Sequence, residues 1–480
     1  MKNLKYLNRF QKNYTILYKI YIIKLLNISS FFKNIMVAPN FHDKQDHLKY
    51  LEKFKINQKR AMFTIILSIL LDVFGYTMVL PLLPIIAKDF GASDFVIGIL
   101  ISSNAFASLI FIPIWGKLSD KYGRKPILVI SQAGTCVSFL FLGLSNTIYI
   151  ILFARILDGI FGGQIPVIRA YITDITTPQT RATHMGKIMV GYTMGMTIGP
   201  LVGGFLGAMH WRFPAFFASS LSILSIIMTI KIIVESMPEE RRTEIKTQIL
   251  ITQTNNGEKS TIWNNEVISR MIQIFLLSLI SFIFTSSFTL VLYKRYNADP
   301  SMTGLVMAAA GLAVMIYGGF LIKPLIKMIG EKRLLITTFI IMIITFLTYP
   351  YLFELWMVFI FILPYSFCVA FMRPLITTNM TKAVGVDKQG ALSGWSTNLQ
   401  AVSQTVAPLI ATAFLQLGSL TIGFLYLDSY HLIGFTNVIL AILLFSIGYI
   451  DIKRHPKLYY YEKLRKKRIA MQKRRKEMNK

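Results

Sequence analysis

The sequence predicts an all-α integral membrane protein with twelve transmembrane helices, arranged as two pseudo-symmetric six-helix bundles. Three observations lead to this fold class: few charged residues, a regular series of apolar runs, and an internal repeat. Only 15% of the 480 residues are charged and the mean hydropathy is +0.54, whereas soluble domains carry about 25% charged residues. A soluble fold could not bury so much apolar surface, but a bilayer acts as a solvent for it.

Twelve apolar runs have the length of about 20 residues that crosses roughly 30 Å of hydrocarbon. The expected spans are residues 61–84, 96–116, 126–145, 148–171, 184–208, 213–233, 271–293, 301–323, 333–352, 354–374, 390–417 and 431–451.

The spans divide the chain into five parts. We expect a basic N-terminal extension (1–60), an N-terminal bundle (61–233), a cytoplasmic linker (234–268), a C-terminal bundle (269–451) and a basic tail (452–480). Lysines interrupt the apolar residues of the extension, which favours an interfacial or disordered segment over a thirteenth span.

The net charge of +28 would suggest nucleic-acid binding in a soluble protein. Here lysine and arginine gather at both ends of the chain and in loops after even-numbered spans, with Arg212, Lys294 and Arg295 as exceptions. This bias predicts that both termini lie in the cytoplasm, most simply at the plasma membrane, and excludes a nucleic-acid partner. We expect the basic termini to contact anionic lipid, with a regulatory partner for the tail as the alternative.

No motif of catalysis or cofactor binding is present. Cys136 and Cys368 each lie inside an apolar run, without CxxC spacing or a nearby histidine. The chain has no HExxH, no Walker-type loop and no cleavable signal-peptide pattern. We therefore expect no enzyme, no metal and no cofactor.

The two halves repeat at an offset of about 207 residues. Gly98 corresponds to Gly304, and Gly123 to Gly330. Spans 5 and 11 match at an offset of 208, with small residues and a proline recurring at equivalent positions. Transporters built from such repeats hold their substrate between the halves.

The loop between spans 2 and 3 carries a dense motif, Gly116-Lys-Leu-Ser-Asp-Lys-Tyr-Gly-Arg-Lys-Pro126. Its glycines permit a tight reversal of the chain, and Asp120 lies among basic residues with which it can form a charge network. The motif resembles the GxLaDrxGrKp signature of the major facilitator superfamily. The resemblance implies the major facilitator fold, and that Gly116, Asp120, Gly123, Arg124 and Lys125 form a gate motif that latches the cytoplasmic side.

Span 5 carries glycines four residues apart, at positions 191, 195, 199, 203 and 207, which form one stripe along a helix. Such a stripe allows a neighbouring helix to pack closely, and this packing alone would be sufficient reason for it. The string also resembles the GxxxGPxxGG motif of antiporters in the superfamily, which implies export. The residues that match it are Gly191, Gly195, Gly199, Pro200, Gly203 and Gly204.

Two carboxylates, Asp72 and Asp158, lie well inside predicted spans at similar depth. Arg155 precedes Asp158 by three residues and shares its helix face. Charged groups within a membrane are costly and mark functional sites. The three residues are candidates for proton coupling, although a self-neutralising structural pair, or an Asp72 satisfied by hydroxyl or backbone groups, remains an alternative.

The strings around these residues resemble drug:proton antiporters with twelve spans, notably the tetracycline exporters. Leu71 to Pro84 follows an LDxxGxxxxxPxLP pattern, Arg155 to Gly163 an RxxxGxxGA-like pattern, and Ala170 to Thr176 an AYIADIT-like pattern. Gln164 and Arg169 depart from that family, which puts the substrate in doubt.

We expect no buried carboxylate in the C-terminal half, only polar and aromatic side chains. We expect these to orient a substrate among apolar walls, with plain packing as the alternative for each. The candidate substrate-contacting residues of both halves are Tyr76, Gln164, Tyr365, Arg373, Trp395, Asn398 and Gln404.

These observations together predict a monomeric, proton-coupled exporter of amphipathic small molecules or drugs, with a small-molecule substrate and protons as its partners. A transporter of a polar metabolite, such as a sugar or organic acid, remains an alternative. So does a non-transporting scaffold or receptor that works through its basic termini.

Overall fold

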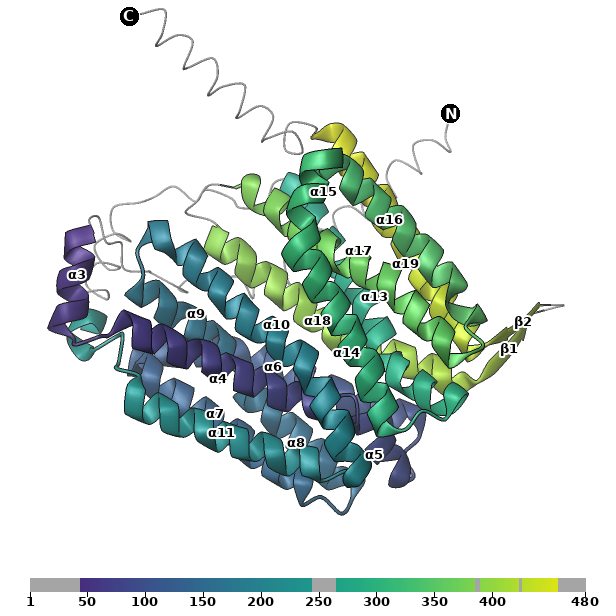
Figure 1. The fold of residues 1–480 in the computed structure, drawn as a ribbon, viewed down its shortest axis with the longest axis horizontal. Helices are drawn as coiled ribbons and strands as arrows, with labels where there is room; N and C mark the ends of the chain where they lie inside the picture. Colours follow the sequence, from purple (N-terminus) through teal and green to yellow (C-terminus); the bar gives the residue numbers. More distant parts are fainter. Residues whose placement is uncertain (1–43, 244–264, 385–388, 423–424, 456–480) are drawn as a thin grey trace, which may run out of the picture.

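The computed structural model describes residues 44–243, 265–384, 389–422 and 425–455. They form two bundles of long helices that lie side by side (Figure 1). The N-terminal bundle contains α4 (Gln58–Val79), α5 (Leu83–Asp89), α6 (Asp94–Tyr122), α7 (Arg124–Gly143), α8 (Ile148–Phe161), α9 (Gln164–Ile175), α10 (Pro178–Met209) and α11 (Phe213–Ile232), with α3 (Lys44–Lys53) before it.

The C-terminal bundle repeats this plan. It contains α13 (Asn265–Tyr296), α14 (Pro300–Ile316), a π-helical turn (Tyr317–Leu321), α15 (Ile322–Ile329), α16 (Glu331–Thr348), a 3-10 turn (Tyr349–Tyr351), α17 (Leu355–Lys382), α18 (Gln389–Leu417) and α19 (Ser429–Arg454). An antiparallel hairpin of β1 (Ser419–Ile422) and β2 (Leu425–Asp428) joins α18 to α19.

The spans agree with the sequence prediction. Eleven helical segments in the described part of the chain are long and apolar enough to cross a membrane. The twelfth is α18, whose 29 residues include Asn398, Gln400, Gln404 and Gln416 and are therefore less apolar. The first span breaks between α4 and α5 at Pro81, because proline cannot donate to the helix ladder.

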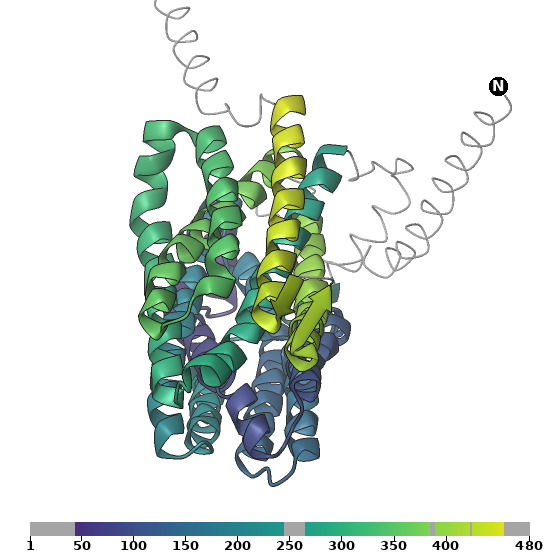
Figure 2. The ribbon, with the colours of Figure 1, turned by 90° about the vertical axis from the view of Figure 1, so that its right-hand side faces the viewer.

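The repeat is confirmed at the turns that precede α7 and α16. Gly123 has φ +106° and Gly330 has φ +85°, so both sites need glycine for a conformation that other residues rarely adopt. We call the end of the molecule that contains Gly123, Gly330 and α3 the motif end. The other end, which contains α5 and the β1–β2 hairpin, is the opposite end (Figure 2).

The two bundles meet mainly through two helix pairs, α10 with α14 and α6 with α18. At the opposite end these helices touch closely: a Cβ added at Gly204 would lie 2.6 Å from the carbonyl oxygen of Pro300 and 3.0 Å from the Cα of Gly304. At the motif end, a Cβ added at Gly186 on α10 or Gly394 on α18 would meet no atom within 4 Å. The halves are therefore closed together at one end and apart at the other.

The described part of the 1–60 extension packs on protein: Tyr50, Leu51 and Ile56 are buried against the N-terminal bundle. The short β1–β2 hairpin differs from the all-helical prediction, because no local signal in the sequence indicates it. Expectations for residues 1–43 and 456–480 lie outside the described residues.

Candidate functional site

Asp72 lies on α4 near the middle of the first span, where the carboxylate is half-buried. Its one hydrogen-bond donor among the described residues is the Gln164 side chain of α9, at 2.9 Å. No described lysine, arginine or histidine lies within ion-pair distance of it, and the Gln164 Oε1 atom is buried without a partner. Asp72 is thus a carboxylate inside the membrane with capacity for a further partner.

Arg155 and Asp158 form the predicted pair on α8, with Nη1 3.1 Å from Oδ2. Both are buried, and the Asn104 amide on α6 donates to the same Asp158 oxygen at 2.8 Å. The Arg155 guanidinium also lies over the Tyr76 ring, 5.4 Å from its centroid. The structure therefore brings together Tyr76, Arg155 and Asp158, and the pair is neutral as a unit.

The candidates of the C-terminal half fall into two groups. Arg373 on α17 is half-buried and donates to the Gln400 Oε1 atom of α18 at 2.7 Å. Trp395, Asn398 and Gln404 are also half-buried on α18. Tyr365 is buried in an aromatic cluster, with its ring centroid 4.4 Å from that of Phe284, so the structure places it in the packing of the bundle.

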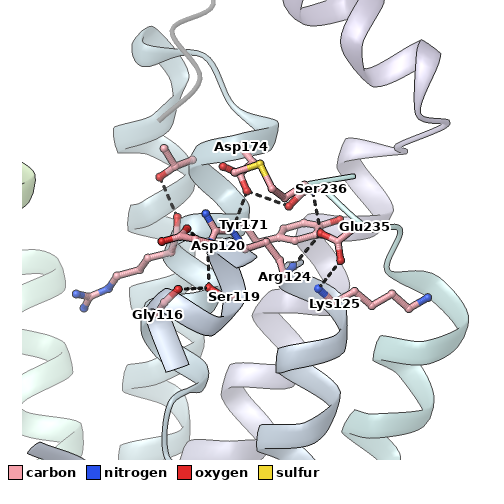
Figure 3. A network of polar contacts seen from close by, with 12 residues as sticks. Gly116, Ser119, Asp120, Arg124, Lys125, Tyr171, Asp174, Glu235 and Ser236 are labelled. Atoms are coloured by element: carbon pink, nitrogen blue, oxygen red, sulfur yellow. Dashed lines mark hydrogen bonds and ion pairs between the residues drawn. The ribbon is translucent and has the colours of Figure 1, made fainter. Parts of the chain in front are cut away.

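The motif residues build a charge network at the start of α7 (Figure 3). The buried Arg124 guanidinium contacts Asp120 at 2.6 Å, Asp174 at 3.1 Å and the Ser119 hydroxyl at 2.6 Å. Asp174 ends α9 and is buried, while Asp120 is 36% exposed. All three partners of Arg124 belong to the N-terminal half.

Glu235, which follows α11, caps the start of α7. Its two carboxylate oxygens accept from the backbone N–H groups of Arg124 at 2.8 Å and Lys125 at 2.9 Å. A carboxylate at a helix N-terminus satisfies donors that lack helical partners and faces the positive end of the helix dipole. A Cβ at Gly123 would lie 2.6 Å from Glu235 Oε2, which is a second reason for glycine there.

The segment around Glu235 also holds α3 against the motif end. The Tyr50 hydroxyl donates to the Ser236 backbone oxygen, and the Ser236 hydroxyl donates to Asp174 at 3.0 Å. A surface pair, Lys53 with Glu240 at 2.9 Å, links the same two segments. The sequence alone predicts that residues 235–240 belong to a linker and does not indicate this role.

A second charge cluster joins the two halves at the opposite end. Asp94, only 3% exposed at the start of α6, pairs with Lys88 of its own half at 2.8 Å and with Lys294 of α13 in the other half. The Gln416 side chain of α18 accepts from the Asp94 backbone N–H at 3.0 Å. Lys294 was an exception to the charge bias of the loops, and this contact explains it.

The expectation that the C-terminal half lacks a buried carboxylate is wrong at one position. Asp451 near the end of α19 is 2% exposed and lies 3.2 Å from the fully buried Arg270 of α13. Asp451 lies at the end of the predicted span 431–451, where a charge is usually solvated. No signal in the sequence linked it to Arg270, which lies 181 residues away.

The glycine stripe of α10 faces α4, as its spacing indicated. A Cβ at Gly191 would lie 2.9 Å from the Ile66 carbonyl oxygen, and one at Gly195 3.0 Å from that of Leu70. Gly199 and Gly203 meet Thr77 and Met78 even more closely. Gly204 faces the other way, toward α14 of the C-terminal half.

Two repeated helical bundles, closed together at one end and carrying charged groups inside the membrane spans, define a membrane transporter. Within the described ranges, no three His, Cys, Asp or Glu side chains gather as they would around a metal ion. The chain belongs to the Major Facilitator Superfamily, whose sequence profile matches residues 65–408. This family membership makes the chain a transporter rather than an enzyme.

Several characterised relatives cover most of the chain. It is 28% identical over 365 residues to the tetracycline resistance protein, class C, of Escherichia coli, covering 75% of this chain and 90% of that protein. It is also 28% identical over 379 residues to multidrug resistance protein 1 of Bacillus subtilis (strain 168), covering 74% of this chain and 90% of that protein.

Solved structures share the fold at low identity. The human organic anion transporter MFSD10 (TETRAN) aligns with a TM-score of 0.59 and 18% identity, over 82% of this chain and 99% of that one. A bacterial homolog of the human lysosomal transporter Spinster, inward-facing and occupied, aligns with a TM-score of 0.64 and 15% identity, over 83% of this chain and 97% of that one.

Proposed function

We propose that this transporter exports amphipathic small molecules in exchange for protons, and that it works in the plasma membrane with both termini in the cytoplasm. The motif end is then the cytoplasmic end, in agreement with the lysines and arginines in its loops. The conformation described above is accordingly open to the cytoplasm and closed to the outside.

The observation that carries this proposal is the environment of Asp72. A carboxylate inside a membrane span without a cationic partner is costly when charged, and its neutral form avoids that cost. Asp72 can therefore take up a proton without breaking any ion pair. The Arg155–Asp158 pair differs, because protonation of Asp158 would leave the buried Arg155 without its counterion.

Proton exchange then follows from competition at Asp72. A proton that enters from outside neutralises Asp72 and weakens its hold on a cationic or hydrogen-bonding substrate, which leaves to the outside. Release of the proton to the cytoplasm restores the charge for the next substrate. Each tenfold difference in proton affinity between the two conformations contributes about 1.4 kcal/mol to their equilibrium.

The named relatives support the direction of transport, and the glycine stripe supports a link between Asp72 and the closed end. The printed names of the relatives refer to tetracycline resistance and multidrug resistance. The glycine stripe of α10 packs on α4, the helix that carries Asp72. Because α10 also contacts α14 at the closed opposite end, a movement of α4 at Asp72 can be passed on to that contact.

The test is transport in proteoliposomes that contain the purified chain, with tetracycline and ethidium as substrates and an imposed pH gradient. We expect uptake that depends on the gradient and is abolished by a protonophore. Asp72→Asn, which removes the titrating group and keeps its size, should lose gradient-driven uptake while still exchanging substrate across the membrane.

The matched control is Asp89→Asn, since Asp89 is an exposed carboxylate at the end of α5. This variant should transport like the parent protein. Gradient-driven uptake that persists in Asp72→Asn would remove Asp72 from the coupling. If neither compound moves in the parent protein, the drug-export proposal fails and the transporter fold stands.

A further inference from the structure

Arg373 is a guanidinium group inside a membrane span that no carboxylate of the described residues neutralises. It is half-buried on α17, and its one hydrogen bond is the 2.7 Å contact with the neutral Gln400. The buried Arg124 and Arg155 do have acidic partners: Arg124 pairs with Asp120 and Asp174, and Arg155 with Asp158. Arg373 has none in the described part of the chain.

Arg169 is a second unneutralised guanidinium, contributed by α9 of the other half. Its exposed side chain forms no hydrogen bond or ion pair with a described residue. Because Arg169 is exposed whereas Arg373 is half-buried, burial penalises the charge of Arg373 more.

A guanidinium group inside a membrane span is costly without an anion. The planar fork of arginine matches a carboxylate or similar acidic group with two parallel hydrogen bonds. Among the described residues, acids of this kind pair with Arg124, Arg155 and Arg270, but none pairs with Arg373. An acidic ligand that enters through the open end can fill this position.

We propose that Arg373, with Gln400, binds an acidic group of the transported substrate. This inference rests on the proposed export function and narrows the substrate class to amphipathic molecules with an acid at one end and a cationic group at the other. The cationic end lies at Asp72, where the unpartnered Gln164 Oε1 accepts a hydrogen bond from it.

The acid is bound by an arginine that stays charged, so the proton competes only with the cationic end at Asp72. Charge on the substrate is thus matched at both ends before the proton enters.

The test compares two dyes that differ only in the presence of a free acid. Rhodamine 6G is a cationic ester, and rhodamine 19 is the corresponding zwitterionic acid. Equilibrium binding to the purified full chain in lipid nanodiscs is measured by fluorescence anisotropy. We expect rhodamine 19 to bind roughly tenfold or more tightly than rhodamine 6G, as one charge-assisted pair predicts.

Arg373→Gln should remove this preference by weakening rhodamine 19 alone, and Arg373→Lys should retain part of it. The matched control is Arg333→Gln, an exposed arginine at the motif end of α16 that should leave the ratio unchanged. Equal binding of the two dyes by the parent protein, no binding of rhodamine 19, or equal weakening of both dyes in Arg373→Gln would overturn the inference.

The same samples separate this inference from the proposed function. Gradient-driven transport of either dye, together with an unchanged dye ratio in Arg373→Gln, would leave the exporter in place and remove the acid subsite. A rhodamine 19 preference that depends on Arg373, without any response of transport to a pH gradient, would keep the subsite and reject proton exchange.

Discussion

The two ends of the molecule use buried charges in opposite ways. At the opposite end, Asp94 connects Lys88 of one half to Lys294 of the other, so the ion pairs cross the boundary between the bundles. At the motif end, Arg124 is held by Asp120 and Asp174 of its own half. The C-terminal half has its own pairs there, Arg270 with Asp451 and Lys382 with Glu331.

This difference distinguishes ion pairs that hold one half together from ion pairs that must break when the two halves separate. A pair within one half keeps the end of that half intact while the halves are apart, whereas a pair between halves exists in only one arrangement. The pairs Asp174–Arg124 and Lys382–Glu331 occupy equivalent positions in the two halves. In each half the pair joins the end of the fourth membrane span to the start of the third, but the acidic and basic residues are exchanged. Each half therefore has its own ion pair that holds this end together.

The largest effect is expected from breaking the network within the N-terminal half. Arg124→Gln leaves Asp174 buried without its cation, and removal of one partner of a buried pair costs about 3–5 kcal/mol. Thermal unfolding can be followed separately in each half with a thiol-reactive dye, in variants that keep only the buried Cys136 or only the buried Cys368. Cys136 should become reactive at a much lower temperature, and Cys368 should change little.

The control for this prediction is the double variant Arg124→Gln/Asp174→Asn. It removes the uncompensated charge as well, so it should regain part of the lost stability. Equal loss of protection at both cysteines would show that the halves do not unfold independently, and that the network serves the whole molecule.

The second prediction concerns the pairs between the halves. Asp94→Asn removes the charge that connects Lys88 and Lys294, at an expected cost of about 2 kcal/mol to the closed opposite end, or roughly a 30-fold shift toward its open form. Spin labels at Tyr149 and Trp356, both exposed at that end in different halves, can report the separation by double electron–electron resonance. The long-distance population should grow.

Lys294→Gln should reproduce this shift, because it also removes a contact between the halves. Lys88→Gln is the matched control: it removes a partner that lies in the same half as Asp94 and should have a smaller effect. An equal response to the two lysine substitutions would mean that Asp94 holds only its own helix in place.

The fold could be predicted from the sequence because the signals are local and periodic. Span length, loop charge and the repeat of Gly123 at Gly330 each depend on residues close in the chain or on simple symmetry. The π-helical turn at Tyr317–Leu321 and the β1–β2 hairpin could not be predicted in this way, since no local signal distinguished them from their surroundings.

The candidate site was predictable only in part. The Arg155–Asp158 pair follows from a three-residue spacing on one helix, and the partners of Arg124 include Asp120 of the same motif. Asp94–Lys294 joins residues 200 positions apart, and each looked like an ordinary loop charge. Such pairs depend on how the bundles pack, which no single segment of sequence encodes.

The third prediction uses two adjacent glycines of α10 to separate packing within a half from packing between halves. Gly203 lies against the backbone of Met78 in its own half, and Gly204 against Pro300 and Gly304 in the other. Overpacking costs about 1–3 kcal/mol.

Gly203→Ala should lower the stability of the N-terminal half. Gly204→Ala should leave that stability unchanged and increase the open population at the opposite end. The cysteine and spin-label measurements above distinguish these outcomes, and two variants with the same response would contradict the division.

The smallest effect on stability is expected at the motif end, from Gly394→Ala on α18. Its added Cβ meets no atom within 4 Å in this conformation, and alanine favours a helix over glycine by up to about 1 kcal/mol. Thermal stability should therefore stay the same or rise slightly.

If the motif end closes during transport as the opposite end is closed here, the same methyl group will meet the partner helix. Gradient-driven transport should then slow although the protein is no less stable. Gly319→Ala, in the π-helical turn of the same half and equally free of neighbours, is the comparison. Unchanged transport in Gly394→Ala would show that α18 does not reach the other half when the motif end closes, and that the two ends close through different helices.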